Sequence, residues 1–223
     1  MKDLKCLMDL AVLPAIGATI PETAYRTHPV FMLAHSVGGA VGSLFLEEHP
    51  EYFDAAVLCS PMHRMLMGGV PDWKVRALLL AAKIAGLDKK PAPGQGGFDP
   101  DERFENSAGM SPARFEQILR LRRRHEEYQT GGATFGWIRA ARRASAKLLR
   151  NASKVQVPVL LLQAKEDTLV DLKAQELFAS RSGNTTIVPF EGAKHELMNG
   201  TDEIRKSFYG EVLRFFAKNG HME

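Results

Sequence analysis

The sequence predicts an α/β protein with a mostly parallel sheet, helices on both faces and one all-helical insertion. Two observations lead to this class. Short apolar segments with strand character alternate with amphipathic segments of helical period, as in parallel sheets. The stretch 62–154 carries no strand signal and divides that alternation into two parts. With 223 residues, 45% hydrophobic and 25% charged, the chain has the length and composition of one ordinary globular domain.

The first 18 residues allow two interpretations. Two lysines and the apolar run at 10–15 superficially resemble a secretory signal peptide. Asp3 and Asp9 disturb the pattern of such a peptide, and Pro14 interrupts its apolar run. The apolar residues instead recur at helical spacing, which favours an amphipathic helix on the core. These residues are Leu4, Leu7, Met8, Ala11 and Val12.

The remaining elements follow in order along the chain. Four short apolar runs are typical of buried parallel strands, and Pro158 is tolerated because it lies near the start of the third. These strands are expected at 30–34, 55–59, 157–163 and 185–190. Helices outside the insertion are expected at 37–48, 172–181 and 202–218. The insertion is expected to form helices at 72–85, 112–128 and 135–149, with Ser111-Pro112 as a favourable helix start.

Composition and spacing exclude several classes of function. No apolar run approaches the roughly 20 residues that a transmembrane helix needs. Cys6 and Cys59 cannot build a disulfide framework and suit a reducing compartment, so we expect a cytoplasmic protein. The sequence has no Cys/His cluster with zinc spacing and no glycine-rich phosphate loop, so no metal or cofactor is expected. The net charge of +3 does not indicate binding to nucleic acid.

A local excess of positive charge is hidden in that total. Between Ser111 and Lys154 the chain carries eleven Lys or Arg residues against three Glu residues. One interpretation is a set of solvated helix faces. The other is contact with lipid phosphate or an anionic bilayer, which would make the protein membrane-peripheral.

The segment Ala34-His35-Ser36-Val37-Gly38 lies where a strand ends and a helix begins. A sharp turn at this place lifts a serine hydroxyl above the sheet, and the crowded turn favours small residues such as Ala34 and Gly38. The Val37 backbone N–H, at the start of the helix, would then face the negative charge that develops on a substrate oxygen. The alternative is an ordinary strand-to-helix turn with an incidental serine.

A serine nucleophile needs a base, and the base needs an acid that orients it. Asp167 follows the third strand and His195 follows the fourth, so both lie at the sheet edge where Ser36 emerges. Asp171 competes as the acid, although its place directly before a helix is better explained as an N-cap.

Three further residues are weaker candidates for contact with a substrate. His35 lies beside Ser36, where packing within the turn is the simpler role. His63 follows the second strand, close to the expected site. Trp137 lies in the insertion, at the end of a Gly-Gly-Ala-Thr-Phe-Gly-Trp segment.

Five segments together resemble a known family; they are 33–40, 59–62, 130–137, 161–171 and 192–196. They are similar to α/β-hydrolases of the lysophospholipase L2 and monoacylglycerol lipase type, and the insertion motif points to the bacterial lysophospholipases L2. The resemblance implies Ser36 as nucleophile, Asp167 as acid and His195 as base. It also implies a hydrolase core at 1–61 and 155–223, with 62–154 as a cap over the acyl site.

One departure from the family bears on activity. Members carry further strands and a His-Gly loop before the nucleophile strand, whereas only 35 residues precede Ser36 here. The resemblance therefore implies an N-terminally incomplete fold, an exposed apolar edge at the nucleophile strand, and a second oxyanion donor missing from the chain. The implied function is a serine carboxylic-ester hydrolase with a lipid ester substrate, either a lysophospholipid or a monoacylglycerol. A generic carboxylesterase and a catalytically impaired fragment remain alternatives.

Overall fold

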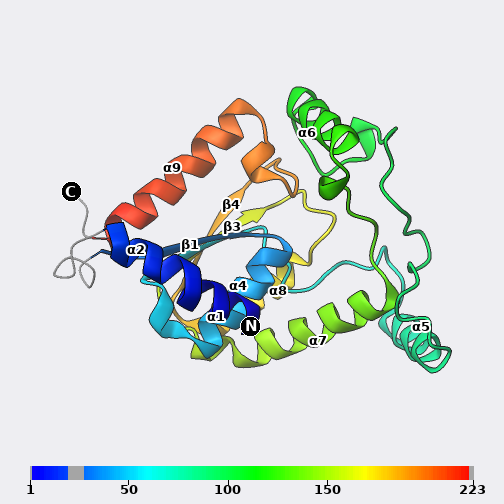
Figure 1. Cartoon of the computed structure of the whole chain (residues 1–223), viewed down its shortest axis with the longest axis horizontal. Coiled ribbons are helices and arrows are strands. Elements are labelled where there is room, and N and C mark those ends of the chain that lie inside the picture. The colour runs from blue at the N-terminus through cyan, green and yellow to red at the C-terminus, as the bar shows by residue number, and fades with distance from the viewer. Residues whose placement is uncertain (1, 20–27, 221–223) are drawn as a thin grey trace.

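A four-stranded parallel sheet forms the centre of the computed structural model, which describes residues 2–19 and 28–220 (Figure 1). The strands lie in the order β1-β2-β3-β4, and each neighbouring pair is parallel. They span Phe31–His35 (β1), Ala55–Cys59 (β2), Val159–Ala164 (β3) and Thr185–Phe190 (β4). The four predicted strands are confirmed. β3 begins after Pro158, which has no N–H to donate to the sheet.

The predicted helices are also present. Outside the insertion they are α4 (Val37–Glu48), α8 (Leu172–Ser182) and α9 (Asp202–Asn219). The insertion forms α5 (Asp72–Ile84), α6 (Pro112–Arg124) and α7 (Phe135–Asn151). α6 ends four residues before its predicted end because His125 adopts an extended conformation, and a single 3-10 turn, Glu126–Tyr128, follows it. The capping predicted at Ser111 is confirmed, since its side chain accepts a hydrogen bond from the Arg114 N–H.

The N-terminal segment is helical, and Leu4, Met8 and Val12 pack on the core as the second interpretation expects, whereas Leu7 of the expected apolar face is exposed. It consists of α1 (Lys2–Leu7), a π-helical turn (Met8–Val12) and α2 (Leu13–Thr19). The π turn ends at Val12, two residues before Pro14, whose ring would clash with a carbonyl of a regular α-helix. Met8 is buried in the core cluster that also contains Phe45 of α4.

Alternate residues of the strands face two apolar clusters on opposite sides of the sheet. Ala56 and Leu58 of β2 pack in the cluster that α4, α7 and α8 cover, together with the N-terminal helix. Val57 and Cys59 of β2 pack in the cluster that α9 covers. Burial raises the pKa of the Cys59 thiol to about 12, so this cysteine is an apolar core residue rather than a nucleophile.

β1 forms one edge of the described sheet and pairs with β2. Phe31 at its start stacks on Phe216 of α9, with ring centroids 4.6 Å apart. Leu33, two residues further along the same face, is 43% exposed, and Val37 and Val41 of α4 are exposed as well. Within the described residues, this agrees with the apolar edge expected at the nucleophile strand.

The insertion leaves the sheet after β2 and returns before β3. Its helices α5 and α7 share a small apolar cluster, which includes Val75, Leu79, Phe135 and Ile138. α6 lies apart from these two helices, on the side of α9 (Figure 1). None of the helices in the described ranges is long and apolar enough to cross a membrane.

Candidate active site

Ser36 occupies a strained turn between β1 and α4. Its φ is 52°, in the left-handed region that non-glycine residues rarely adopt. The prediction that crowding explains a glycine at position 38 is wrong, because a Cβ at Gly38 would meet no atom within 4 Å. The crowded position is Gly39, where a Cβ would lie 2.6 Å from the Cβ of Pro61. The loop after β2 therefore presses on the first turn of α4.

Backbone hydrogen bonds tie this turn to the neighbouring strand ends. The Ser36 N–H donates to the Cys59 carbonyl at 3.0 Å, and the Met62 N–H donates to the Ser36 carbonyl at 2.8 Å. Ser60, at the end of β2, also has a positive φ of 41°, and its N–H donates to the Leu162 carbonyl at 2.9 Å. The position of Ser36 is thus set by three adjacent strand ends rather than by its own turn alone.

The structure brings Ser36, His195 and Asp167 into one hydrogen-bonded chain. His195 Nε2 lies 2.8 Å from Ser36 Oγ, and His195 Nδ1 lies 2.6 Å from Asp167 Oδ2. Asp167 Oδ1 accepts hydrogen bonds from the backbone N–H groups of Leu169 (2.8 Å) and Val170 (3.2 Å). Since the Nδ1 proton is donated to Asp167, Nε2 is free to accept the hydroxyl proton of Ser36.

Asp171 has the place expected of an N-cap. Its Oδ1 accepts a hydrogen bond of 3.0 Å from the Lys173 N–H at the start of α8. Its other oxygen, Oδ2, pairs with Arg64 Nη1 at 3.0 Å. These contacts favour Asp167, rather than Asp171, as the partner of His195.

The three weaker candidates have different surroundings. His35 Nε2 lies 3.3 Å from the backbone carbonyl oxygen of His195, so this ring contacts the base directly, and burial lowers the pKa of His35. His63 is fully buried, with Nε2 2.9 Å from Ser43 Oγ and its ring against Phe178. Burial lowers the pKa of His63 to about 3, so it is a neutral core residue that substrate does not reach in this structure.

Trp137 lies in the first turn of α7, and its backbone N–H donates to Thr134 Oγ1. Its side chain is 42% exposed. Substrate contact by Trp137 stays a prediction.

Sequence reasoning missed a buried amide network beneath the site. Gln163 at the end of β3 donates to Gln175 of α8 at 3.2 Å, and Gln175 donates to the Pro61 carbonyl at 3.1 Å. This network connects β3, α8 and the loop that presses on Gly39. The sequence signal for this network is Gln163, a polar residue at the end of the apolar run Val-Leu-Leu-Leu-Gln, because a buried amide needs hydrogen-bond partners.

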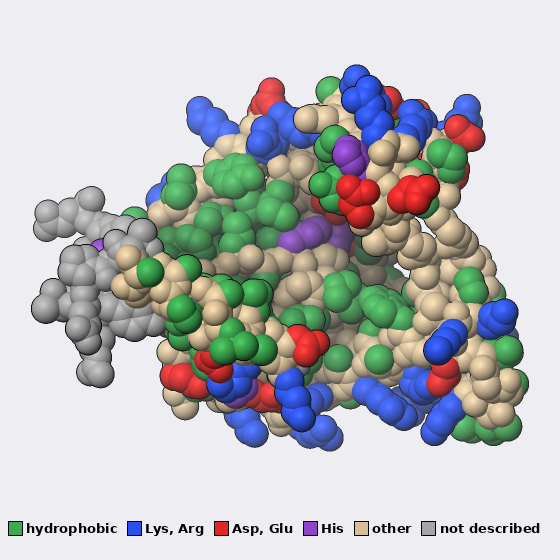
Figure 2. Space-filling model, viewed as in Figure 1, with side chains coloured by type: hydrophobic (Ala, Val, Ile, Leu, Met, Phe, Trp, Pro, Cys, Tyr) green, Lys and Arg blue, Asp and Glu red, His purple; other side chains and the backbone are tan. Residues whose placement is uncertain are grey.

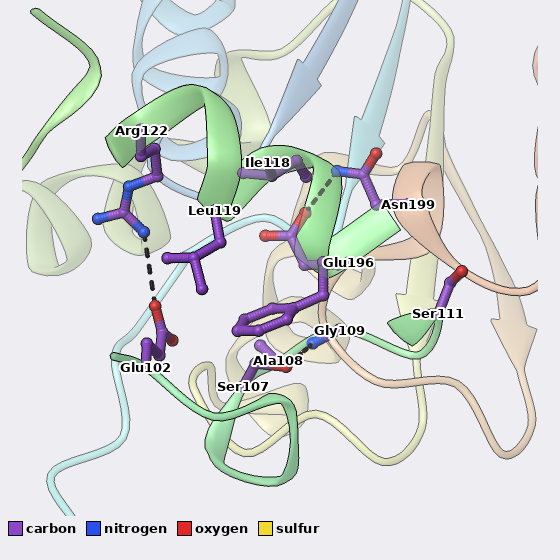
Figure 3. Close-up of a pocket in the computed structure, with 11 residues that line it drawn as sticks. Glu102, Ser107, Ala108, Gly109, Ser111, Ile118, Leu119, Arg122, Glu196 and Asn199 are labelled. Carbon is purple, nitrogen blue, oxygen red and sulfur yellow. Dashed lines mark hydrogen bonds and ion pairs between the residues drawn. The ribbon is translucent and has the colours of Figure 1, made fainter. Parts of the chain in front are cut away.

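A pocket of about 380 Å³, the α6 pocket, is lined by Glu196, which follows His195 in the sequence, but by none of Ser36, Asp167 and His195 (Figure 3). α6 contributes Ile118, Leu119 and Arg122 to its wall, and the connection from β4 to α9 contributes Glu196 and Asn199. Figure 2 shows histidine side chains within a hollow at the centre of the viewed face. The insertion and the connection that carries His195 thus meet at this pocket.

Glu196 adds a carboxylate to this pocket. One of its oxygens lies within 4.8 Å of ring nitrogens of both His35 and His195. These three side chains could in principle surround a metal ion. Both ring nitrogens of His195 already contact Ser36 and Asp167, however, so the arrangement does not fit a metal centre.

The parallel sheet, the positive-φ serine between strand and helix, and the acid and histidine after later strands define the α/β-hydrolase class. A family model described as "Serine aminopeptidase, S33" matches residues 5–202, and the chain belongs to this hydrolase family. Lysophospholipase L2 of Escherichia coli is 28% identical over 199 residues, which cover 85% of this chain and 58% of the relative. Monoglyceride lipase of Mus musculus is 30% identical over 190 residues, which cover 84% of this chain and 58% of the relative.

A solved structure is similar as well. The crystal structure of a soluble variant of monoglyceride lipase from Saccharomyces cerevisiae superposes with a TM-score of 0.65 at 18% identity. The match covers 89% of this chain and 68% of that one, and it supports the fold. The chain spans 58% of the length of the two curated relatives above.

Proposed function

We propose that this protein is a serine carboxylic-ester hydrolase. The observation that carries the proposal is the imidazole of His195, which joins Ser36 Oγ at 2.8 Å to Asp167 Oδ2 at 2.6 Å. Ser36 Oγ attacks the acyl carbonyl while His195 Nε2 takes its proton, and Asp167 stabilises the resulting imidazolium. His195 then gives the proton to the leaving alcohol. Water, activated by the same imidazole, hydrolyses the acyl-enzyme and restores Ser36.

Val37 supplies the backbone N–H that we assign to the oxyanion. It is the first residue of α4, and the first N–H groups of a helix have no partner within the helix. They are therefore available to the negative oxygen of the tetrahedral intermediate. Removing one such donor typically lowers the rate by about 10²–10³-fold.

We propose lysophospholipids or monoacylglycerols as the substrate class. The names of the Escherichia coli and mouse relatives support this proposal. The α6 pocket supports it too, because α6 lines it with apolar side chains while Glu196 and Asn199 supply polar groups. In this proposal residues 62–154 act as a cap over the acyl site, and 1–61 with 155–223 form the catalytic core.

A fluorophosphonate probe tests the enzymatic assignment, because stable labelling requires an activated serine. We expect labelling of the full chain at Ser36, and loss of labelling in Ser36→Ala and in His195→Ala. Mass spectrometry of the labelled peptide identifies the site. Absence of labelling in a cooperatively folded chain would favour the catalytically impaired alternative. Labelling at a different serine would remove Ser36 as the nucleophile.

The substrate class needs a separate experiment. p-Nitrophenyl butanoate, octanoate and dodecanoate, compared by kcat/KM, distinguish a lipid-ester hydrolase from a generic carboxylesterase. We expect kcat/KM to rise with chain length and 1-acyl glycerophospholipid or monoacylglycerol to be hydrolysed. A maximum at butanoate, without hydrolysis of either lipid, would favour the carboxylesterase.

We further propose peripheral contact with anionic membranes through the arginines at the end of α6. Arg122, Arg123 and Arg124 occupy its last turn. Basic side chains gather along the edge of the molecule where α6 lies (Figure 2). Arg122 pairs with Glu102 at 3.6 Å and Arg123 with Glu116 at 3.7 Å, which reduces the charge available to lipid.

Liposome co-sedimentation tests this contact. Binding should favour anionic over neutral vesicles, weaken as salt screens the charges, and fall in Arg122→Gln/Arg123→Gln/Arg124→Gln. Equal binding to both vesicle types, unchanged by salt, would exclude the electrostatic contact.

A further inference from the structure

A second cavity, the α5–α7 groove, lies away from the triad. Its volume is about 780 Å³, within the range of about 300–1,000 Å³ that is usual for small-molecule sites. α5 lines it with residues at helical spacing, among them Arg76, Leu80 and Lys83. α7 faces them with Arg142 and Arg143. The groove shares no lining residue with the α6 pocket.

The groove carries a strong excess of positive charge. Six cationic side chains line it against one carboxylate, Asp72. Asp72 pairs with both Arg76 and Arg142, so one carboxylate serves two guanidinium groups. The lining residues Arg139 and Arg64 are paired with Asp88 and Asp171, which lie outside the lining.

Two cations of the groove lie beyond ion-pair distance of every carboxylate that the structure describes, although the charges of both act on Asp88 at longer range. Among the described residues, no carboxylate oxygen forms an ion pair with Lys83 or Arg143, and both side chains are exposed. Counting all three aspartates against the six cations leaves a surplus of three positive charges. Guanidinium groups bind phosphate through paired N–H donors, and a phosphate monoester brings up to about two negative charges.

The other part of the lining is apolar. Leu79 and Leu149 are buried, and Met65 is half-buried. Leu80 is 59% exposed although it lies on the groove side of α5, between the positions of Arg76 and Lys83. An exposed leucine beside unpaired cations suits a ligand with one apolar chain and one anionic head.

We propose that the α5–α7 groove binds a single-chain amphiphile with a phosphate ester head group. Lys83 and Arg143 contact the phosphate, and Leu80 with Leu79 contacts the alkyl chain. The proposal is independent of the esterase assignment, because none of these side chains belongs to the triad.

Isothermal titration of the full chain with decyl phosphate, below its micellar concentration, tests the proposal. Decyl phosphate has no carboxylic ester, so binding is measured without turnover. We expect it to bind at least about tenfold more tightly than inorganic phosphate, which lacks the chain, or decyl maltoside, which lacks the charge. Its affinity should fall as salt rises, since partly exposed charges are screened.

Variants locate the site. Lys83→Gln/Arg143→Gln should weaken decyl phosphate at least about tenfold, because two charge-assisted contacts are lost. Leu80→Ser should weaken decyl phosphate but leave inorganic phosphate unchanged. The matched control is Arg150→Gln/Lys206→Gln, which removes one arginine and one lysine from exposed positions outside the groove and should change neither affinity.

Several results would overturn the proposal. An equal loss in the control pair would show a general charge effect, and unchanged binding in Lys83→Gln/Arg143→Gln would remove the groove as the site. Equal affinities for inorganic phosphate and decyl phosphate would reveal a free-phosphate site without a chain contact. Equal binding of decyl maltoside would indicate detergent adsorption. If the double variant does not melt cooperatively, Arg143→Gln alone must still weaken decyl phosphate measurably, or the proposal fails.

Discussion

Substitution of Asp167 by Asn tests the catalytic assignment most sharply, because it removes one charge and almost no volume. Asp167 Oδ1 accepts two backbone N–H groups, from Leu169 and Val170, and the amide oxygen of Asn can keep both. The amide NH₂ then faces His195 Nδ1 in place of Oδ2. Two donors cannot share this contact, so the imidazole must move its proton to Nε2 and can no longer accept one from Ser36.

The expected loss follows from that tautomer. In serine hydrolases with the same arrangement, the equivalent change lowers kcat by roughly 10⁴-fold. This corresponds to about 5 kcal/mol of transition-state stabilisation. Initial rates with p-nitrophenyl octanoate measure the loss, and a thermal melt of the same sample confirms that the variant is folded.

Asp171→Asn provides the matched control. Asn caps helices about as well as Asp, so the contact to Lys173 N–H survives. The variant loses the exposed pair with Arg64, which is worth at most about 1 kcal/mol. We therefore expect near wild-type kcat and a fall in Tm of at most about 2–4 °C. If Asp171→Asn abolishes turnover while folded Asp167→Asn retains it, the choice of acid is refuted.

Three further sets of substitutions test the triad, a buried carboxylate and the crowded turn. Ser36→Ala and His195→Ala should each remove most esterase activity, and the double variant should be little worse, because members of a triad act as a unit; rates that multiply would argue against a shared mechanism. Burial raises the pKa of Glu47 to about 7 in the folded protein, above its ordinary value in the unfolded chain. The folded state therefore keeps the proton to higher pH, and the free energy of unfolding falls as pH rises from about 5 to about 7. Glu47→Gln should therefore be about 1–2 kcal/mol more stable than wild type near pH 8, after a discount for solvent screening, and equal near pH 5; melts with the same difference at both pH values would contradict this. Gly39→Ala places a Cβ 2.6 Å from Pro61 Cβ, so fluorophosphonate labelling should slow at least about tenfold while the chain stays folded, and unchanged labelling would show that the turn relaxes without cost.

The strands and the triad could be predicted because their patterns are local. A buried strand is a short apolar run, and the catalytic chemistry requires Ser, Asp and His in order at the strand ends. The structure places Ser36, Asp167 and His195 in contact, as expected. Each of these three positions can be assigned from its residue type and from its place after a predicted strand.

Features that depend on tertiary packing could not be predicted. The basic stretch is one segment in the sequence, yet α6 and α7 lie on separate parts of the molecule (Figure 1), so its arginines form two surfaces. The groove arises because α5 packs beside α7, and no periodicity specifies that pairing. His63 follows a strand end just as Asp167 does, but the core encloses it. Glu47 sits on a regular helix, and nothing in the sequence marks its carboxylate, which is buried without a hydrogen-bond partner.

The two cysteines of this chain differ in accessibility, which makes the sheet observable by chemical labelling. Cys6 on α1 is exposed, whereas Cys59 lies buried at the end of β2, where its carbonyl accepts the hydrogen bond from the Ser36 N–H. A maleimide should therefore modify one thiol in the native protein and two after unfolding. The slow rate at Cys59 would measure how often β2 opens, by the same logic as amide hydrogen exchange. A ligand that closes the site should slow that rate and leave Cys6 unchanged.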